Sequence, residues 1–366
     1  MGKVKVLQVI GTLQIGGAET IAMNFARYMN KEKFQIDYLV FGNNVGEYEV
    51  EAINLGSKVM HIESPSNGYI KYMKNLKEIL INGKYDVIHT HLLSNNGLSL
   101  KVAHHLNVSK RISHSHSTNS GKKMNSIYQM YVYLMRKFIK KYATHYIACG
   151  KDAANYLYGE KISKEKGIII NNGIDVNKYS FSKEKRIKIR NEFNLKNAIV
   201  IGHIGRLSVV KNHDFLLRIF KELYLLNNNV LLLIVGDGEL KTHIENKCID
   251  LGIEDRVIMT GNRLDVADLV HAIDIFVFPS LYEGLPVAMI EAQASGAPCI
   301  VSDNITSDVK ITNLVTFLSI NQDPKIWANK ILENVNINRI NCSQELTEKG
   351  FDILESIFQL EQIYLS

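Results

Sequence analysis

Two glutamates eight positions apart, Glu283 and Glu291, lie in a stretch whose residue types suit ligand binding. An apolar strand ending at Phe278 passes through a turn with Gly284 into a helix that we expect to begin at Pro286. Proline suits a first helical turn because the N–H that it lacks would be unpaired there. Glu283 then precedes a helix N-terminus, where backbone N–H groups favour anions. The pair predicts a pocket at the carboxyl edge of a parallel sheet.

Arg206 and Lys211 add positive charge at the end of another expected strand, Ala198–Ile204. The arginine fork and the lysine point charge together suit a diphosphate. Two solvated surface cations are the ordinary alternative. The glutamates expected on the same sheet edge favour a binding site.

Four histidines form two His-x-His pairs, His89 with His91 and His114 with His116, at the ends of successive expected strands. The spacing places both rings of a pair on one face of a strand. Zinc is one interpretation, but no acidic or cysteine ligand is grouped with them, and we expect no metal. Hydrogen bonding to a ligand hydroxyl fits better. A core role for His89 and His114 stays open.

A glycine-rich turn follows the first apolar run, Val4–Ile10. Gly16 and Gly17 would let a phosphate approach the N-terminus of the next helix. A tight strand-to-helix turn explains them about as well. The loop lacks the GxGxxG and Walker patterns, so ordinary dinucleotide or P-loop binding is not supported.

Strand-like runs alternate with helical patterns along the whole chain, which indicates an α/β protein with parallel sheets and right-handed crossovers. A polar segment after the Asn-Asn-Gly-Ile-Asp run at 171–175 interrupts the series. We expect two doubly wound, Rossmann-like domains, residues 1–180 and 181–345. Residues 346–366 are expected to form a helix that packs back on the first domain.

Charge is divided unevenly along the 366 residues. Residues 1–180 hold 24 Lys and Arg against 13 Asp and Glu, whereas residues 181–366 hold 19 against 24. A basic half suits an anionic membrane or a phosphorylated substrate. No nucleic-acid recognition motif accompanies it, and we expect no nucleic-acid partner. The four cysteines are dispersed, which suggests reduced thiols.

The segment Lys122–Lys141 combines six cations with apolar residues and three tyrosines. A basic, aromatic, amphipathic helix fits an anionic membrane surface. An ordinary domain helix with an apolar core side and solvated cations is the alternative. The basic first half favours membrane contact. Neither a membrane-spanning run nor a signal peptide is expected.

These motifs together resemble the family-4 retaining glycosyltransferases of GT-B fold, and the resemblance covers nearly the whole chain. It rests on Glu283-x7-Glu291 within its Pro-Ser-x-x-Glu-Gly-x-Pro context, with support from four further motifs: Gly16-Gly-Ala-Glu19, Asn172-Gly-Ile-Asp175, Gly205-Arg206 with Lys211, and Gly236-Asp-Gly-Glu239. It implies a nucleotide-sugar donor bound in a cleft between two domains, with no metal or other cofactor.

The resemblance also implies residue roles. Arg206 and Lys211 would hold the diphosphate, Glu291 the ribose hydroxyls and Glu283 the transferred sugar. Of the histidines, His116 best matches the one near the donor sugar, and His114 stays a candidate. The remaining donor-binding positions would be Gly16, Gly17, Gly205, Gly284 and Leu285.

Within the family, the context of Lys211-Asn-His213 and of residues 302–306 is most similar to capsular or exopolysaccharide assembly enzymes. The resemblance therefore implies a lipid-linked saccharide acceptor, a uridine donor and a cytoplasmic enzyme on the inner face of the plasma membrane. Two alternatives stay open. They are a UDP-sugar 2-epimerase of the same architecture and a non-catalytic nucleotide-sugar or glycan-binding module.

Overall fold

The chain folds into two α/β units, and the computed structural model describes residues 2–117 and 125–366. Unit 1 comprises Met1–Gly173 with Ile353–Ser366, and unit 2 comprises Ile174–Asp352. The expected boundaries, after 180 and 345, thus differ from the observed ones by a few residues. The reason is that Ile174 joins an apolar cluster of unit 2 that includes Leu346.

Unit 1 is built on a parallel sheet of order β3-β2-β1-β4-β5-β6-β7. Its strands are β1 (Val4–Val9), β2 (Phe34–Phe41), β3 (Val59–Ile62), β4 (Val87–Thr90), β5 (Lys110–Ser115), β6 (His145–Ala148) and β7 (Gly167–Ile169). Its helices are α1 (Gly17–Tyr28), α2 (Glu49–Asn54), α3 (Tyr69–Gly83), α4 (Asn96–His105), α5 (Ser126–Tyr142), α6 (Lys151–Tyr158), α7 (Glu160–Lys166) and α16 (Ile353–Leu365).

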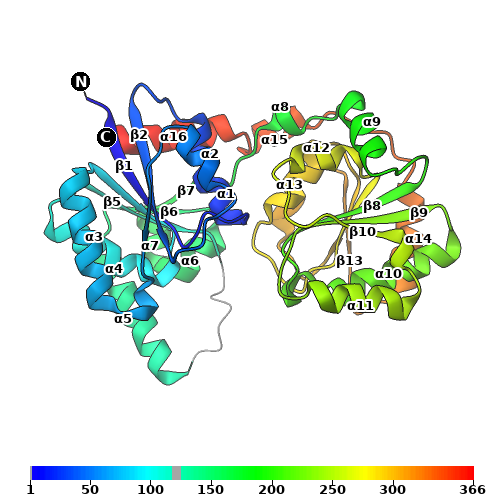
Figure 1. Cartoon of the computed structure of the whole chain (residues 1–366), viewed down its shortest axis with the longest axis horizontal. Coiled ribbons are helices and arrows are strands. Elements are labelled where there is room, and N and C mark those ends of the chain that lie inside the picture. The colour runs from blue at the N-terminus through cyan, green and yellow to red at the C-terminus, as the bar shows by residue number, and fades with distance from the viewer. Residues whose placement is uncertain (1, 118–124) are drawn as a thin grey trace. The chain divides into compact units, whose positions relative to one another are not determined.

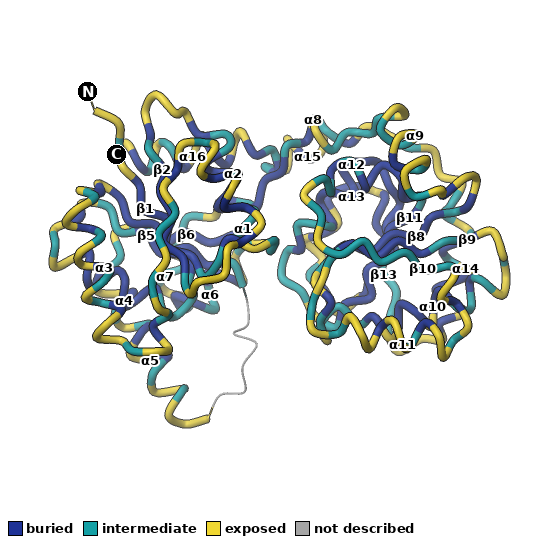
Figure 2. Tube along the Cα trace, in the orientation of Figure 1, coloured by how far each residue is buried: buried dark blue, intermediate teal, exposed yellow. Residues whose placement is uncertain are grey.

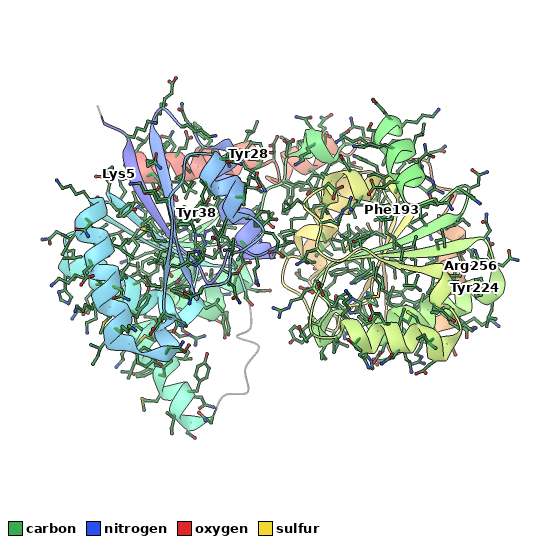
Figure 3. All side chains as sticks on the ribbon, in the orientation of Figure 1. Lys5, Tyr28, Tyr38, Phe193, Tyr224 and Arg256 are labelled. Atoms are coloured by element: carbon green, nitrogen blue, oxygen red, sulfur yellow. The ribbon has the colours of Figure 1, made fainter. Side chains whose placement is uncertain are left out.

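The two faces of the unit 1 sheet are covered by different helices (Figure 1). Helices α3 to α6 pack on one face, where Leu76, Leu100 and Ile139 are fully buried. Helices α1 and α16 lie on the other. Tyr38 points from β2 into the interior of the unit (Figure 3), and its hydroxyl donates to the Ala22 carbonyl of α1 at 2.8 Å. The last helix of the chain therefore lies beside the first elements.

Unit 2 repeats the design with a parallel sheet of order β10-β9-β8-β11-β12-β13. Its strands are β8 (Ile199–Ile204), β9 (Val230–Val235), β10 (Val257–Met259), β11 (Ile275–Phe278), β12 (Cys299–Ser302) and β13 (Val315–Leu318). Its helices are α8 (Val176–Tyr179), α9 (Lys183–Glu192), α10 (His213–Leu226), α11 (Lys241–Leu251), α12 (Val266–Leu269), α13 (Val287–Ala294), α14 (Pro324–Asn334) and α15 (Ser343–Glu348). The expected α/β class with two parallel-sheet domains is confirmed.

The buried sheet of unit 2 explains why its strands are nearly continuous apolar runs. One face carries α10, α11 and α14, with Trp327 fully buried among them, and the other carries α9, α12 and α13. Figure 2 shows the strands buried and the outer sides of the helices exposed. Each fully buried leucine or isoleucine contributes about 1.5–3 kcal/mol relative to an exposed one.

Strand order reverses between β1 and β4 in unit 1 and between β8 and β11 in unit 2. The loops that leave two such strands go to opposite faces of the sheet, so a crevice opens at their carboxyl ends, where ligands of doubly wound sheets bind. The loops after β8 and β11 carry Lys211 and Glu283. The topology therefore places the strongest pair of predicted site residues at the switch point of unit 2.

Candidate functional site in unit 2 and a histidine cluster in unit 1

Four loops at the carboxyl edge of the unit 2 sheet are joined by backbone hydrogen bonds. The N–H to carbonyl pairs are Gly205 to Val235 at 2.9 Å, Leu207 to Asp237 at 3.0 Å, Gly236 to Gly261 at 3.0 Å and Leu281 to Val210 at 2.8 Å. The loops after β8, β9, β10 and β11 are therefore one framework. The backbone positions from which its charged side chains project are therefore fixed relative to one another.

Gly236 permits the closest approach in this framework. Its φ is +136°, and a Cβ there would lie 2.2 Å from the Gly205 carbonyl oxygen. Only glycine tolerates both conditions. The Gly-Asp-Gly-Glu motif thus has a packing role beneath the loop that carries Arg206.

Lys211 and Glu283 form an ion pair with 2.6 Å between Nζ and Oε1. Both side chains are mostly buried, 15% and 18% exposed, and the Lys211 Nζ also lies 4.4 Å from the centroid of the Phe278 ring. Removing one member of such a pair leaves the other charge uncompensated. The contact holds the ammonium at the switch point, and an anion bound there would share it with Glu283.

Arg206 is held much more loosely. Its side chain is 75% exposed and lies 3.3 Å from a carboxylate oxygen of Glu239. Exposed ion pairs are worth little, so the guanidinium can turn toward an anionic ligand at small cost. Glu239 does not cap the helix that follows it. Helix α11 begins at Lys241 with Leu240 at its N-cap and has no side-chain cap.

Glu291 is buried on α13, with 7% of the residue exposed. Burial raises the pKa of its carboxyl above the ordinary value, and the Tyr179 hydroxyl, which donates to Oε1 at 2.5 Å, opposes that shift. The helix begins at Val287, one residue later than expected, with Pro286 as its N-cap. Gly284 and Leu285 fill the turn between Glu283 and this proline.

Tyr179 is the residue that the sequence analysis missed. It ends α8, a short helix whose first turn is capped by Asp175, which accepts from the Lys178 N–H at 2.9 Å. The Asp175 cap was visible in the sequence. The contact between Tyr179 of this helix and Glu291 of α13, 112 positions along the chain, could not be seen in the sequence.

The four histidines of unit 1 come together as one cluster. His89, His91 and His114 are buried, and their candidate ligand nitrogens all lie within 4.8 Å of one another. Burial lowers the pKa of all four rings, that of His116 to about 4, so they are neutral near pH 7. Within residues 2–117 and 125–366, no carboxylate or thiolate joins the three-histidine group. The four histidine rings therefore form a neutral cluster that can donate and accept hydrogen bonds.

Gly16 and Gly17 lie at the N-terminus of α1, also in unit 1. Gly16 is the N-cap residue, and a Cβ there would meet a Glu19 carboxylate oxygen at 2.4 Å. Gly17 has open space on that side. The predicted residues thus form two groups. Unit 2 brings together Arg206, Lys211, Glu283, Glu291, Gly205, Gly284 and Leu285, while unit 1 holds Gly16, Gly17, His114 and His116.

Helix α5 covers most of the basic segment predicted for membrane contact, and Lys122 and Lys123 lie outside the described residues. Its inner face packs Val132, Met135 and Ile139 into the core. The outer surface exposes a mixed set, which we name the α5 patch: Ile127, Met130, Tyr133, Leu134, Lys137, Lys140 and Lys141. The inner face is thus that of an ordinary domain helix, and membrane contact by the outer face stays a prediction. In the part of the chain that the structure describes, no helix is long and apolar enough to cross a membrane.

Comparison with known proteins gives consistent matches over the whole chain. Residues 15–178 match the family model described as Glycosyltransferase Family 4, and residues 185–350 match Glycosyl transferases group 1. EpsF of Bacillus subtilis, which is named a glycosyltransferase, is 32% identical over 98% of this chain and 96% of its own.

Two further relatives have more specific names. UDP-Gal:alpha-D-GlcNAc-diphosphoundecaprenol alpha-1,3-galactosyltransferase of Escherichia coli is 29% identical over 81% of this chain and 79% of its own. CapH of Staphylococcus aureus, a capsular polysaccharide biosynthesis glycosyltransferase, is 25% identical over 99% of both chains.

Among solved structures, HepE of Anabaena in complex with UDP and glucose superimposes with a TM-score of 0.80 at 19% identity, over 99% of this chain and 100% of that one. The lipopolysaccharide glycosyltransferase WaaG matches with a TM-score of 0.73 at 14% identity, over 98% and 99%. The expected GT-B fold is confirmed.

Proposed function

The chain belongs to glycosyltransferase family 4, and we propose that it moves a sugar from a uridine diphosphate sugar to a lipid-linked saccharide with retention of anomeric configuration. The relatives support the finer parts of the proposal. The Escherichia coli relative is named for a UDP-galactose donor and a diphosphoundecaprenol-linked acceptor, and HepE is described with UDP.

One observation carries the proposal, namely the charged set at the switch point of unit 2. Lys211 is fixed by Glu283, Arg206 can turn, and all of them stand on loops joined to one another. We assign the two cations to the diphosphate, where they stabilise the negative charge that grows as it leaves. Glu291 accepts from the ribose hydroxyls, and Glu283 from a hydroxyl of the transferred sugar.

The reaction then breaks the bond between the anomeric carbon and the diphosphate oxygen. An acceptor hydroxyl oxygen forms the new bond to that carbon on the same face, and its proton passes to the departing diphosphate. The protein's share is positioning and charge stabilisation, which can supply most of the rate enhancement in such a transfer. No protein nucleophile is part of the proposal.

Substitution of the cation and of the ribose-binding carboxylate tests this assignment. We expect Lys211→Ala to lower kcat/KM by about 10²-fold, as for removal of one preorganised charge from a transition state. Glu291→Ala should mainly weaken donor binding. Transfer is measured with UDP-, GDP- and ADP-sugars and a short-chain polyprenyl diphosphate saccharide. Lys241→Ala, on the exposed start of α11, is the matched control.

Near-normal transfer by both Lys211→Ala and Glu291→Ala would contradict the assignment of these residues to the donor site. Release of an epimerised free sugar without a glycan product would instead identify an epimerase, and donor binding without turnover would identify a binding module. Because Arg206 and Lys211 are assigned the work of charge neutralisation, we propose that no metal is required. Transfer should persist in excess EDTA, and its loss and recovery with Mg²⁺ or Mn²⁺ would contradict this.

We also propose that the enzyme works at the cytoplasmic face of the plasma membrane and docks there through the α5 patch. Ile127 is 82% exposed and Met130 59%, and the Lys137 ammonium lies 4.6 Å from the Tyr133 ring centroid. Apolar side chains beside lysines can enter the headgroup region while the cations meet anionic lipids.

Vesicle flotation with and without anionic phospholipid tests the docking proposal. The triple variant Lys137→Gln, Lys140→Gln and Lys141→Gln should reduce binding to anionic vesicles strongly, since each basic residue near the surface contributes about 1 kcal/mol. A control with the same charge change replaces Lys161, Lys164 and Lys166, which are exposed on α7. If the two triple variants bind anionic vesicles equally well, the α5 patch is not the docking surface.

A further inference from the structure

Six polar side chains of unit 1 form one continuous hydrogen-bonded chain, which we name the histidine chain. Gln8 is on β1 and Tyr364 is on α16, and both are buried. They flank the four histidines: His89, His91, His114 and His116. Figure 1 shows α16 crossing behind the first two strands of this unit. The last helix thus supplies a side chain to the first sheet, where its hydroxyl contacts Gln8 and His89.

The first arm runs from Gln8 through Tyr364 to His114. The Gln8 amide donates from Nε2 to the Tyr364 oxygen at 3.0 Å, and the Tyr364 hydroxyl lies 2.6 Å from His89 Nδ1. Because the Tyr364 oxygen already accepts from Gln8 and His89 Nδ1 is the acceptor within reach of its hydroxyl, we assign the Tyr364 proton to the bond with His89. A neutral His89 then carries its proton on Nε2 and donates to His114 Nδ1 at 3.1 Å. This leaves the His114 proton on Nε2.

The second arm runs from the other end of the same amide. Gln8 Oε1 can only accept, and His91 Nε2 lies 2.7 Å from it, so His91 carries its proton on Nε2. His91 Nδ1 is then an acceptor for His116 Nε2–H at 2.7 Å. His116 is left with an unprotonated Nδ1.

One amide therefore orders the protons of all four rings, and each is the Nε2–H tautomer. The surroundings keep the rings neutral, because Phe25 stacks against His89 and His114 and burial opposes a charge. Two buried atoms at the ends of the chain have no partner among the described residues, His114 Nε2 and His116 Nδ1. The arrangement presents one donor and one acceptor.

We propose that Gln8 and Tyr364 are positioning residues that hold the histidine chain in this single proton order, so that His116 Nδ1 accepts from a substrate hydroxyl and His114 Nε2–H donates to a substrate oxygen. The substrate part rests on the proposed function, in which that substrate is a sugar. A buried polar atom without a partner costs free energy, so a ligand that satisfies both ends is stabilised accordingly. Because His114 can only donate and His116 can only accept at these atoms, the pair discriminates between substrates by where they carry an acceptor oxygen and a hydroxyl.

Long-range ¹H–¹⁵N correlation spectra of the ¹⁵N-histidine-labelled, ligand-free full chain test the proton order directly. We expect four rings with the Nε2–H pattern and no protonation between pH 6 and 8. Assignment uses the loss of signals in single His→Gln variants. An Nδ1–H pattern at His91 or His116 would overturn the proposal, because it requires the opposite orientation of the Gln8 amide. Equimolar Zn²⁺ that shifts His89, His91 and His114 together would also overturn it, in favour of a metal site.

Two variants test the order of the arms, one by releasing the first arm alone and the other by releasing both. Tyr364→Phe removes the donor to His89, so His89 and His114 should become tautomer mixtures while His91 and His116 keep Nε2–H. Gln8→Met removes both the acceptor for His91 and the donor to Tyr364, so all four rings should become tautomer mixtures. Tyr72→Phe is the control, since it removes a buried hydroxyl of the same unit that bonds Ser99 at 2.7 Å. Both arms should keep their pattern in it.

Transfer kinetics then connect proton order to function. Gln8→Met should lower kcat/KM about tenfold, the effect of losing one hydrogen bond to substrate, with UDP affinity unchanged. Mixed tautomers with unaltered kinetics would overturn the substrate role. If no sugar is transferred by the native chain, the proposed function fails while the tautomer result stands. If transfer occurs without the expected tautomers, this inference alone fails.

Discussion

At the scale of single residues, the binding role proposed for Glu291 would come at the expense of stability. Its burial raises the pKa of the carboxyl, so the native state disfavours the charged form. A carboxyl with a raised pKa adds stability below its unfolded pKa and loses that stability as pH rises through its folded pKa. Near pH 8 the buried charge therefore costs free energy that a neutral side chain would not.

Glu291→Gln should consequently raise the melting temperature at pH 8, with a smaller gain at pH 5, because glutamine still accepts from Tyr179. The variant should also bind UDP more weakly, by about tenfold, since a neutral acceptor replaces a charged one. Thermal melts at the two pH values and calorimetric UDP titration measure both effects. A variant that is less stable than the native chain at pH 8 would contradict the argument.

Tyr179 was missed because hydrogen bonding at 112 positions of separation depends on tertiary packing. Glu283, Glu291, Arg206 and Lys211 could be predicted as site residues because their types and their places after strands are local properties of the sequence. Their pairing was not found. The sequence placed Lys211 near a diphosphate and Glu283 near a sugar, but the 2.6 Å contact between them depends on how the loops after β8 and β11 pack.

At the scale of elements, the framework of four loops makes the backbone as important as the charged side chains. Gly236→Ala places a Cβ against the Gly205 carbonyl at a φ of +136°. We expect a loss of about 3 kcal/mol or more in the free energy of unfolding, from steric overlap added to backbone strain. Transfer should fall as well because Arg206 is displaced. Chemical denaturation and transfer assays report the two effects.

Gly261 supplies the matched control, since it accepts the hydrogen bond from Gly236 and also has a positive φ, +69°. A Cβ there meets no atom within 4 Å. Gly261→Ala should therefore cost only the strain of a left-handed residue, about 1–2 kcal/mol. If both variants lose the same stability, close packing of the loops is not what Gly236 provides.

Elements were predicted well where the pattern is local and buried. The runs Val4–Ile10 and Ala198–Ile204 and the run ending at Phe278 predicted β1, β8 and β11 to within a residue or two. Strand β13 was missed because it is a short edge strand of four residues, three of them only partly buried. The start of α13 was placed one residue early, at Pro286, since proline is compatible with both the N-cap and the first helical position.

At the scale of the whole molecule, the alternation of strands and helices was enough to predict two parallel-sheet units, and it was not enough to place their limits. Those limits are set by side chains such as Ile174, which packs with Leu346 rather than with the strand that precedes it. The return of the last helix to unit 1 was expected. Its consequence, a tyrosine ordering histidines 275 positions away, depends on contacts that no local pattern contains.

Buried neutral histidines in both units predict how the whole protein responds to acid. Burial lowers the pKa of a histidine in the folded state, whereas the unfolded chain takes up a proton near pH 6.5. The unfolded state then binds more protons, so stability falls as pH drops from about 6.5 toward about 4, by up to about 1.4 kcal/mol per pH unit for each group. The groups are His89, His91, His114, His116 and His145 in unit 1 and His203, His213 and His271 in unit 2.

The melting temperature should therefore fall steeply between pH 6.5 and 5 and change little between 7 and 8. His271→Leu isolates one contribution, because this ring is buried, its pKa is lowered to about 4 and neither nitrogen has a hydrogen-bond partner among the described residues. The variant should lose less stability on acidification than the native chain while keeping its stability near pH 8. If the melting temperatures of the native chain and of His271→Leu fall in parallel across this pH range, proton uptake by His271 does not drive acid unfolding.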